Sequence, residues 1–266
     1  MYRKRLLLAL VGVAAAILGV APAIAIYPPV ADGTGHPNVG ILVSEWKTPG
    51  VKDRLCTGTL IAPTVFLTSA HCDPASDGIP PDKVWVSFDP VYEFDNSTLY
   101  HGTFIPNPNY HDYHAAGATA DDPNDIAIVR LDIAPPNVTP ATLPTAGLLS
   151  NLALRGQSFT VVGYGRTRID KTKGPNNIVN QWARNVGTVT FRSLQNLWLM
   201  QDANPSTGNV TTCYGDSGGP HFLGDSNMVV AITSTGDIPC RANDVSYRLD
   251  TPSARNYLEA QGITLP

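Results

Sequence analysis

Short apolar runs recur along the chain, separated by clusters of Gly, Pro, Asn and Asp. The runs are rich in Val, Ile, Thr and aromatic residues, as β-strands are, and repeated short strands at this spacing indicate a sandwich or barrel. Strands are predicted at residues 39–46, 57–69, 83–88, 125–132, 158–165, 186–193, 197–201 and 228–236.

A single helix is predicted near the end of the chain. Thr251 can cap it, Pro252 suits its first position and Gly262 can stop it. Residues 134–145, APPNVTPATLPT, contain four prolines and no charge, so they are the best candidate for a linker. We therefore expect similar halves at about 36–133 and 146–250, followed by a helix at about 252–261.

The N-terminus has the pattern of a secretory signal peptide. Three basic residues precede an uncharged apolar run from Leu6 to Val20, and a small-x-small cleavage site follows at Ala23-Ile24-Ala25. The alternative is a membrane anchor, which needs about 20 apolar residues and here would have to pass through Pro22. We predict a signal peptide at residues 1–25, a mature chain that starts at Ile26, and export from the cell.

Composition narrows the classes of partner. The 266 residues are 43% hydrophobic and 15% charged, with a formal net charge of −4. This is the composition of a water-soluble globular chain, and its weak acidity gives no electrostatic footprint for nucleic acid or an anionic membrane. We expect no nucleic-acid partner and no stable membrane association once the signal peptide is removed.

The four cysteines are expected to form disulfides, because an even number in an exported chain favours disulfides over metal ligands. Spacing alone does not choose among the three possible pairings. The local pairing joins Cys56 to Cys72 and Cys213 to Cys240, and each bridge would contribute roughly 3 kcal/mol. A zinc site is the weaker alternative, since no two cysteines have CxxC spacing.

Candidate nucleophilic chemistry centres on TTCYGDSGGPHF, residues 211–222, where Ser217 lies among three glycines. Taken alone, this composition is also that of a tight surface turn. A serine nucleophile needs a base and a group that orients the base. His71 in TSAHC and Asp125 at the start of DIAIVRL are the candidates, with Asp121 and Asp122 as competitors and the other five histidines expected to be structural or solvated.

The segments TSAHC, NDIAIVRL and GDSGGP, in this order, resemble the three signature segments of the chymotrypsin/trypsin-like serine endopeptidases. The resemblance covers the chain from GHPNVGILV to the terminal helix. It implies an all-β fold of two packed antiparallel six-stranded β-barrels with a C-terminal helix. It also implies a secreted monomer without a cofactor or metal, which hydrolyses protein or peptide substrates through an acyl-enzyme.

Carried over to this sequence, the resemblance makes His71 the general base, Asp125 its orienting partner and Ser217 the nucleophile. The backbone N–H groups of Gly215 and Ser217 would form the oxyanion hole. Asp216 would pair with a newly formed N-terminal ammonium. The usual activation sequence, a basic residue followed by Ile-Val-Gly-Gly, is absent. The hypothesis is that signal cleavage frees Ile26 for this pairing; a short pro-segment removed elsewhere is the alternative.

The resemblance also points to substrate-binding residues. Thr211 would lie at the base of the primary pocket, followed by Thr212, in place of the aspartate that selects basic side chains. Ser234, Thr235 and Gly236 would form the pocket wall. We expect Asp244 to be an exposed loop carboxylate. The alternative is that it approaches the pocket from the far side and partly restores a preference for basic residues.

Other features are weaker. A metal site from His111, His114, Asp121 and Asp122, or a calcium loop from Asp89, Glu93 and Asp95, is not predicted. Sequons occur at Asn96, Asn137 and Asn209. Two other functions stay open: a catalytically inactive homologue that binds a partner through the same cleft, and an esterase or protease of narrow specificity.

Overall fold

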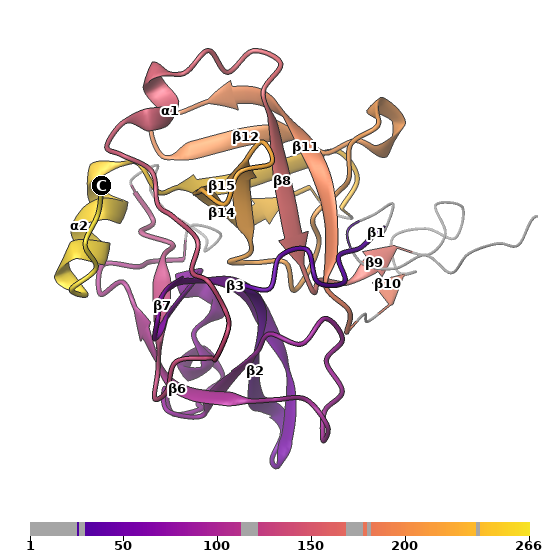
Figure 1. Ribbon diagram of the computed structural model, residues 1–266, viewed down its shortest axis with the longest axis vertical. Coiled ribbons are helices and arrows are strands. Elements are labelled where there is room, and N and C mark those ends of the chain that lie inside the picture. The colour runs from indigo at the N-terminus through magenta and orange to yellow at the C-terminus, as the bar shows by residue number, and fades with distance from the viewer. Residues whose placement is uncertain (1–25, 27–29, 113–121, 169–177, 180–181, 238–239) are drawn as a thin grey trace, which may run out of the picture.

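A computed structural model describes residues 26, 30–112, 122–168, 178–179, 182–237 and 240–266. Nearly all its regular structure is β-strand, and Figure 1 shows two barrels stacked one on the other, the N-terminal one in indigo to magenta. The signal-peptide prediction for residues 1–25 lies outside the described residues.

The N-terminal barrel closes through six antiparallel strands in the order β2-β3-β4-β7-β6-β5. Alternate apolar residues such as Leu42, Phe66 and Val86 fill its interior and are fully buried, as the two-residue period of a strand requires. The strands are β2 (Val39–Thr48), β3 (Val51–Ala62), β4 (Val65–Thr68), β5 (Val84–Ser87), β6 (Tyr100–Pro106) and β7 (Ala127–Leu131).

The C-terminal barrel follows the order β8-β11-β12-β15-β14-β13, and β13 pairs back onto β8 to close it. Its six strands are β8 (Ser158–Gly163), β11 (Asn185–Leu194), β12 (Trp198–Asp202), β13 (Pro220–Leu223), β14 (Val229–Gly236) and β15 (Asn243–Arg248). Strand β1 (Val30–Ala31) pairs antiparallel with the first two residues of β11. The remaining short elements are η1 (Ala70–Cys72), η2 (Pro74–Asp77), α1 (Leu148–Asn151), β9 (Thr167–Arg168), β10 (Ile178–Val179) and η4 (Pro205–Thr207).

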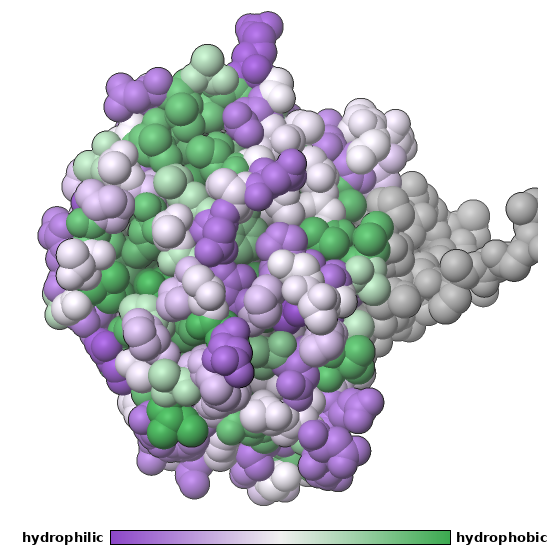
Figure 2. All heavy atoms as spheres, viewed as in Figure 1, coloured by the Kyte–Doolittle hydropathy of each residue, from purple (hydrophilic) through white to green (hydrophobic). Residues whose placement is uncertain are grey.

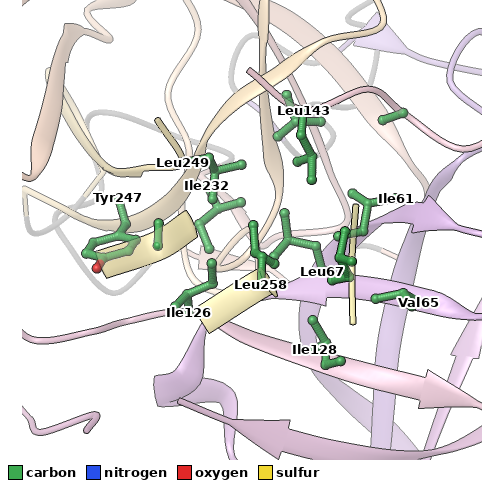
Figure 3. Packing of buried hydrophobic residues seen from close by; sticks show 14 of the residues in the cluster. Ile61, Val65, Leu67, Ile126, Ile128, Leu143, Ile232, Tyr247, Leu249 and Leu258 are labelled. Atoms are coloured by element: carbon green, nitrogen blue, oxygen red, sulfur yellow. The ribbon is translucent and has the colours of Figure 1, made fainter. Parts of the chain in front are cut away.

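One apolar cluster joins the two barrels. Leu67 and Ile128 of the N-terminal barrel belong to the same buried cluster as Ile232 of the C-terminal barrel and Leu258 of the terminal helix (Figure 3). That helix, α2 (Pro252–Ala260), is capped by Thr251. The Tyr257 hydroxyl accepts a hydrogen bond from the Ile128 amide (3.0 Å) and donates to the Ile105 carbonyl (2.6 Å), so α2 fastens the chain end to the first barrel.

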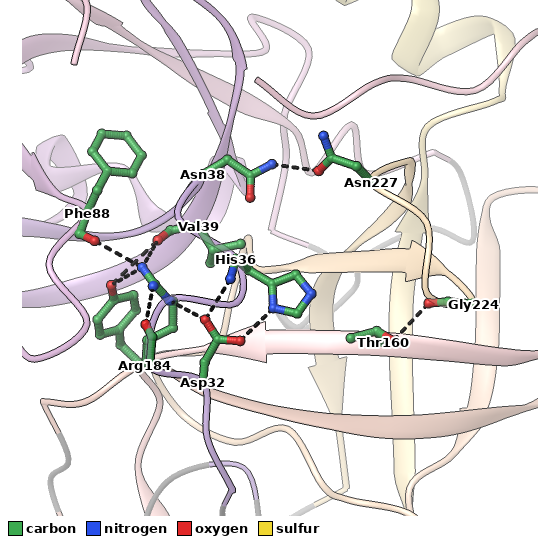
Figure 4. A network of polar contacts seen from close by, with 11 residues as sticks. Asp32, His36, Asn38, Val39, Phe88, Thr160, Arg184, Gly224 and Asn227 are labelled. Carbon is green, nitrogen blue, oxygen red and sulfur yellow. Dashed lines mark hydrogen bonds and ion pairs between the residues drawn. The ribbon is translucent and has the colours of Figure 1, made fainter. Parts of the chain in front are cut away.

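A buried arginine binds the N-terminal segment to both barrels (Figure 4). Arg184 donates from Nε to Asp32 (2.7 Å) and from a terminal nitrogen to the Val39 and Phe88 carbonyls (3.0 Å each). The side chains of Arg184 and Asp32 are only 1% and 2% exposed. Asp32 also accepts from the amide of His36 at 2.9 Å. Such a fully paired arrangement offsets the cost of burying two charges.

The predicted fold class is confirmed: the chain forms two closed six-stranded antiparallel barrels and a C-terminal helix. The strand predictions were incomplete. Residues 57–69 form parts of two strands, β3 and β4, because the chain turns at Pro63-Thr64. Of the barrel strands, β6, β13 and β15 were missed, and so were the two-residue strands β1, β9 and β10.

Polar and apolar residues are mixed on the outer surface. Figure 2 shows polar and apolar residues interspersed over the face seen in Figure 1. Neither helix in the described part of the chain has the length and hydropathy needed to cross a membrane.

Candidate active site

His71 is held at the end of strand β4 by covalent and polar bonds. It lies in the single turn η1, directly before Cys72, whose disulfide to Cys56 anchors the turn to β3. Its backbone amide donates to Asp125 Oδ1 at 2.9 Å, and its ring Nδ1 lies 2.9 Å from Asp125 Oδ2. The imidazole plane is therefore fixed from both the backbone and the ring.

Asp125 precedes β7 and is completely buried. Besides its two contacts to His71, it accepts a hydrogen bond from the Ser234 hydroxyl of β14, which belongs to the other barrel. Burial acts to raise the pKa of Asp125, but the nearby His71 and the hydrogen bonds from His71 and Ser234 outweigh it and hold the pKa below the ordinary value. Asp125 is an anion placed to orient an imidazole.

The same pair sets the basicity of His71. Burial alone lowers the pKa of the imidazole, while the negative charge and hydrogen bond of Asp125 raise it, and the net result is a pKa above the ordinary value. The His71 side chain remains 27% exposed, and Nε2 has no hydrogen-bond partner among the described residues. One ring nitrogen thus holds the aspartate while the other is available to a ligand.

Ser217 lies in a turn whose glycines are required by its geometry. Gly215 and Gly218 have φ values of +96° and +75°, a region that favours glycine. A Cβ on Gly218 would lie 2.1 Å from Thr68 Oγ1 and 2.6 Å from the Thr57 carbonyl oxygen. The Thr57 amide donates to the Ser217 carbonyl at 3.0 Å. The turn is therefore pressed against the strands of the N-terminal barrel.

His71 and Ser217 line one cleft of about 1070 Å³. The cleft also receives Thr212, Ser234, Thr235 and Gly236, all of which were predicted to bind substrate; its complete lining is Ala70, His71, Asp73, Ser76, Tyr110, Asp112, Thr212, Cys213, Tyr214, Ser217, Thr233, Ser234, Thr235, Gly236, Asp237 and Cys240. Thr211 is buried and is not among the lining residues. Among the described residues that line it, the charged side chains other than His71 are aspartates.

Two backbone amides at the serine turn are unpaired. Within the described residues, the N–H groups of Gly215 and Ser217 donate to no protein acceptor, whereas the Gly215 carbonyl accepts from the Thr57 hydroxyl at 2.8 Å. That bond fixes the orientation of the peptide group after Gly215. Unpaired amides next to a cleft can hold a developing negative charge.

Asp216 is buried in a tight backbone cradle. Its carboxylate accepts from the amides of Gly165 (2.7 Å) and Cys213 (2.9 Å), and a Cβ on Gly163 or Gly165 would lie 2.1 or 2.2 Å from its oxygens. Burial raises the pKa of Asp216 to about 7, opposed by these two hydrogen bonds and by the charge of Arg54. The charge of Arg54 therefore does not offset the effect of burial on the Asp216 carboxylate.

The predicted partner of Asp216 is the N-terminal ammonium of Ile26, and the structure describes Ile26 within the uncleaved chain. The Ile26 side chain is 1% exposed and packs into the apolar cluster of the C-terminal barrel, which also contains Val161 and Val210. In the full chain Ala25 precedes Ile26, so the Ile26 nitrogen is an amide rather than an ammonium. Arg54 was not anticipated as a neighbour of Asp216; no local motif marks it.

The prediction that Asp244 is an exposed loop carboxylate is wrong. Asp244 lies in strand β15 and is completely buried, because β15 pairs with β12 and β14 on its two sides. The Thr212 hydroxyl donates to Asp244 Oδ2 at 2.7 Å. His221, expected to be structural or solvated, is completely buried beside it, 3.6 Å from Asp244 Oδ1.

The described residues that could gather around a metal ion are Cys56, His71 and Cys72. Both cysteines are consumed by their disulfide, so they offer no thiolate. The second disulfide, Cys213–Cys240, borders the cleft. His114 and Asp121 of the weak metal alternative lie outside the described residues.

Comparison with known proteins identifies the family. The family model for trypsin matches residues 36–258, and the chain therefore belongs to the trypsin family. Brachyurin from Leptuca pugilator is 30% identical over 187 residues, covering 68% of this chain and 75% of that protein. Kallikrein 1-related peptidase b21 from Mus musculus is 26% identical over 197 residues, covering 70% and 71%.

Two further relatives extend this result. Melanization protease 1 from Drosophila melanogaster is 31% identical over 241 residues, which cover 74% of this chain and 55% of that protein, so the chain spans little more than half its length. The solved structure of HL collagenase covers 91% of this chain and is itself covered completely, with a TM-score of 0.66 and 20% identity. At that identity the likeness concerns the fold alone.

Proposed function

We propose that this chain is a secreted serine endopeptidase that hydrolyses protein or peptide substrates through an acyl-enzyme. The observation that carries the proposal is a chain of hydrogen bonds in which the Ser234 hydroxyl donates to Asp125 and Asp125 contacts the His71 ring. His71 and Ser217 line the same cleft. Membership of the trypsin family supports the same reaction class.

In the proposed reaction, Ser217 Oγ attacks the substrate carbonyl carbon while His71 Nε2 takes the hydroxyl proton. Asp125 keeps the imidazole in the tautomer with a proton on Nδ1 and stabilises the imidazolium that forms. His71 then returns the proton to the leaving amine as the peptide C–N bond breaks. Water attacks the acyl-enzyme by the same route, which restores the Ser217 hydroxyl.

The unpaired amides of Gly215 and Ser217 are the proposed oxyanion hole. As the carbonyl becomes tetrahedral, its oxygen gains negative charge, and two preorganised N–H donors stabilise that charge. Losing one such donor typically costs ~10²–10³-fold in rate. The positive φ of Gly215 supports this role, because it allows a backbone orientation that a residue with a side chain rarely adopts.

Export and activation are proposed as one event. Cleavage after Ala25 would turn the Ile26 nitrogen into an ammonium and supply Asp216 with the positive charge it needs. The buried position of the Ile26 side chain supports this assignment. The two disulfides are consistent with secretion.

The test is the intact mass of the secreted protein before and after an organophosphonate serine probe, with Ser217→Ala as the control. We expect one adduct per wild-type molecule, none on Ser217→Ala, and an untreated mass that starts at Ile26. A chain that starts at Ile26 and takes no adduct would support the inactive binding homologue instead. An adduct accompanied by cleavage of esters and no peptides would support the esterase.

A further inference from the structure

A second aspartate, Asp122, lies three residues before Asp125 and is not among the residues that line the cleft. The Tyr247 hydroxyl of β15 donates to its Oδ1 at 2.9 Å, and the Ser253 hydroxyl in the first turn of α2 donates to its Oδ2. The Tyr247 ring belongs to the apolar cluster that joins the two barrels (Figure 3). Hydrogen bonds to a charged group are roughly twice as strong as neutral ones, so these contacts fasten the segment before β7 to the second barrel and the helix.

The Asp122 carboxylate also shapes the turn that leads into Asp125. Its Oδ1 accepts from the Asn124 backbone amide at 2.9 Å, and the Asn124 side-chain amide donates back to the Asp122 carbonyl at 2.8 Å. Asn124 has a φ of +54°, an uncommon left-handed conformation that persists only where the surrounding structure enforces it. The two bonds hold Asn124 in that conformation, and the direction of the chain at Asn124 determines where the next residue, Asp125, lies.

The position of Asp125 allows little displacement. Its carboxylate lies 2.9 Å from His71 Nδ1, accepts from the His71 amide at 2.9 Å and also accepts from Ser234 of the second barrel. Asp125 is completely buried, so water does not replace a contact that is lost. A displacement of about 1 Å in a catalytic group can lower a rate about 100-fold. The turn at residues 122–124 is therefore part of what orients His71.

We infer that Asp122 is a positioning residue that sets the place of Asp125 against His71. It acts through the hydrogen bonds described above and does not contact the substrate. The inference rests on the proposed endopeptidase function and adds a residue to its machinery. The charges that raise the pKa of His71 are those of Asp125 and Asp112, so Asp122 is expected to act through geometry and not through its own charge.

The test separates geometry from charge with two substitutions at one position. Asp122→Asn removes the charge but keeps an oxygen that can accept from Tyr247 and Asn124. Its amide group can also donate to the Ser253 hydroxyl oxygen. Asp122→Ala removes all of these side-chain contacts. The measurements are kcat and KM for a peptide substrate over a range of pH, with kcat expressed per active site counted by phosphonate labelling of Ser217.

We expect Asp122→Ala to lower kcat about 10- to 100-fold with little change in KM, because the loss falls on the orientation of His71. The inflection of kcat/KM with pH should also move below its wild-type value, since a displaced Asp125 raises the pKa of His71 less. Asp122→Asn should keep the kcat and the inflection of the wild type. Equal shifts in the two variants would show a direct charge effect and overturn the inference, and so would wild-type kcat and inflection in Asp122→Ala.

Two tyrosines supply a matched comparison. Tyr247→Phe removes a hydroxyl that donates to Asp122. Tyr257→Phe removes one that also bonds the first barrel, but at Ile105 and Ile128. Both variants lose hydrogen bonds and some stability, but we expect only Tyr247→Phe to lower the inflection and the kcat per active site. The change should be smaller than in Asp122→Ala, because one hydroxyl still donates to the carboxylate. Equal changes in both tyrosine variants would overturn the inference.

Failure of the inference can be told from failure of the proposed function. Phosphonate labelling counts folded active sites in every variant, so an Asp122→Ala protein that does not fold would be recognised and Tyr247→Phe would then decide. Full labelling with no effect of Tyr247→Phe on kcat or on the inflection would overturn the positioning role alone. No labelling of wild-type protein would overturn the endopeptidase itself.

Discussion

At the scale of single residues, the protonation of His71 sets the pH range of the proposed reaction. Only the neutral imidazole can take a proton, and Asp125 raises the pKa of His71 above its ordinary value of 6.5 despite burial. We expect kcat/KM to rise with pH through an inflection above 6.5. In Asp125→Asn the charge is gone, so the inflection should move lower and kcat should fall by ~10⁴-fold. Superimposable pH profiles would contradict the role of Asp125.

The glycines of the serine turn give a second residue-scale prediction. Gly218→Ala places a methyl group 2.6 Å from the Thr57 carbonyl and 2.7 Å from the Ser69 amide nitrogen, both backbone atoms that cannot move aside. We expect loss of about 2–4 kcal/mol of unfolding free energy and loss of phosphonate labelling. Gly50→Ala is the matched control, since Gly50 also has positive φ (+82°) but nothing within 4 Å; it should cost about 1 kcal/mol. Equal losses would show that the cost is φ strain alone.

The sequence motifs identified the candidate catalytic residues, but they did not predict which residues from distant parts of the chain would contact them. The segments around His71, Asp125 and Ser217 were found because each is a continuous run of residues. The hydroxyl of Ser234 on Asp125, and Arg54 near Asp216, depend on chain segments that meet only in the folded protein. Asp244 was misplaced for the same reason: its burial comes from pairing with β12 and β14, which RANDVSYRLD does not reveal.

At the scale of elements, the strongest apolar runs were predicted correctly as strands and the weak ones were missed. β6, YHGTFIP, contains Gly and Pro, and β15, NDVSYR, is mostly polar. β13 is only four residues long, and its first three residues belong to the segment interpreted as the serine motif. Barrel closure supplies neighbours on both sides to each of these strands, and those hydrogen bonds override weak local propensity.

The N-terminal segment gives a prediction at this scale. In the full chain, where the Ile26 nitrogen is an amide, burial raises the pKa of Asp216 to about 7, so the folded state holds a proton that the unfolded state releases. We expect a chain extended by one glycine before Ile26 to keep a raised pKa at Asp216, because its Ile26 nitrogen is also an amide. Stability from this group is therefore full at low pH and is lost as pH rises toward 7. A free Ile26 ammonium should lower that pKa and remove the loss. We expect the stability difference between the two chains, measured by urea unfolding, to be larger at pH 7.5 than at pH 5.

A parallel pH dependence in the two chains would contradict pairing between Ile26 and Asp216. An Asp216→Asn variant supplies the control, because it removes the Asp216 carboxyl from both chains. The part of the stability difference that grows with pH through Asp216 should then disappear. Phosphonate labelling of the same samples links the charge at Asp216 to formation of the site. Weaker labelling of the extended chain is expected at pH 7.5.

At the scale of the whole molecule, the candidate site exists only because two barrels are held together. His71 and Asp125 belong to the first barrel, whereas Ser217 and Ser234 belong to the second. The shared apolar cluster, the Tyr257 hydrogen bonds and Arg184 all cross the boundary. A change that loosens the contact between the barrels should therefore damage the site without touching it.

Arg184 is the sharpest test of this coupling. Arg184→Met removes the bonds to Asp32, Val39 and Phe88. Among the described residues, the buried Asp32 carboxylate then keeps only its hydrogen bonds with His36. We expect a loss of about 3–5 kcal/mol in unfolding free energy and a parallel loss of phosphonate labelling, because an unpaired buried charge is costly. Adding Asp32→Asn should recover part of the stability, since the buried charge is then absent. If the double variant loses the sum of the two single losses, Arg184 and Asp32 act independently; a recovery shows that the pair fastens the N-terminal segment across the barrels as one unit.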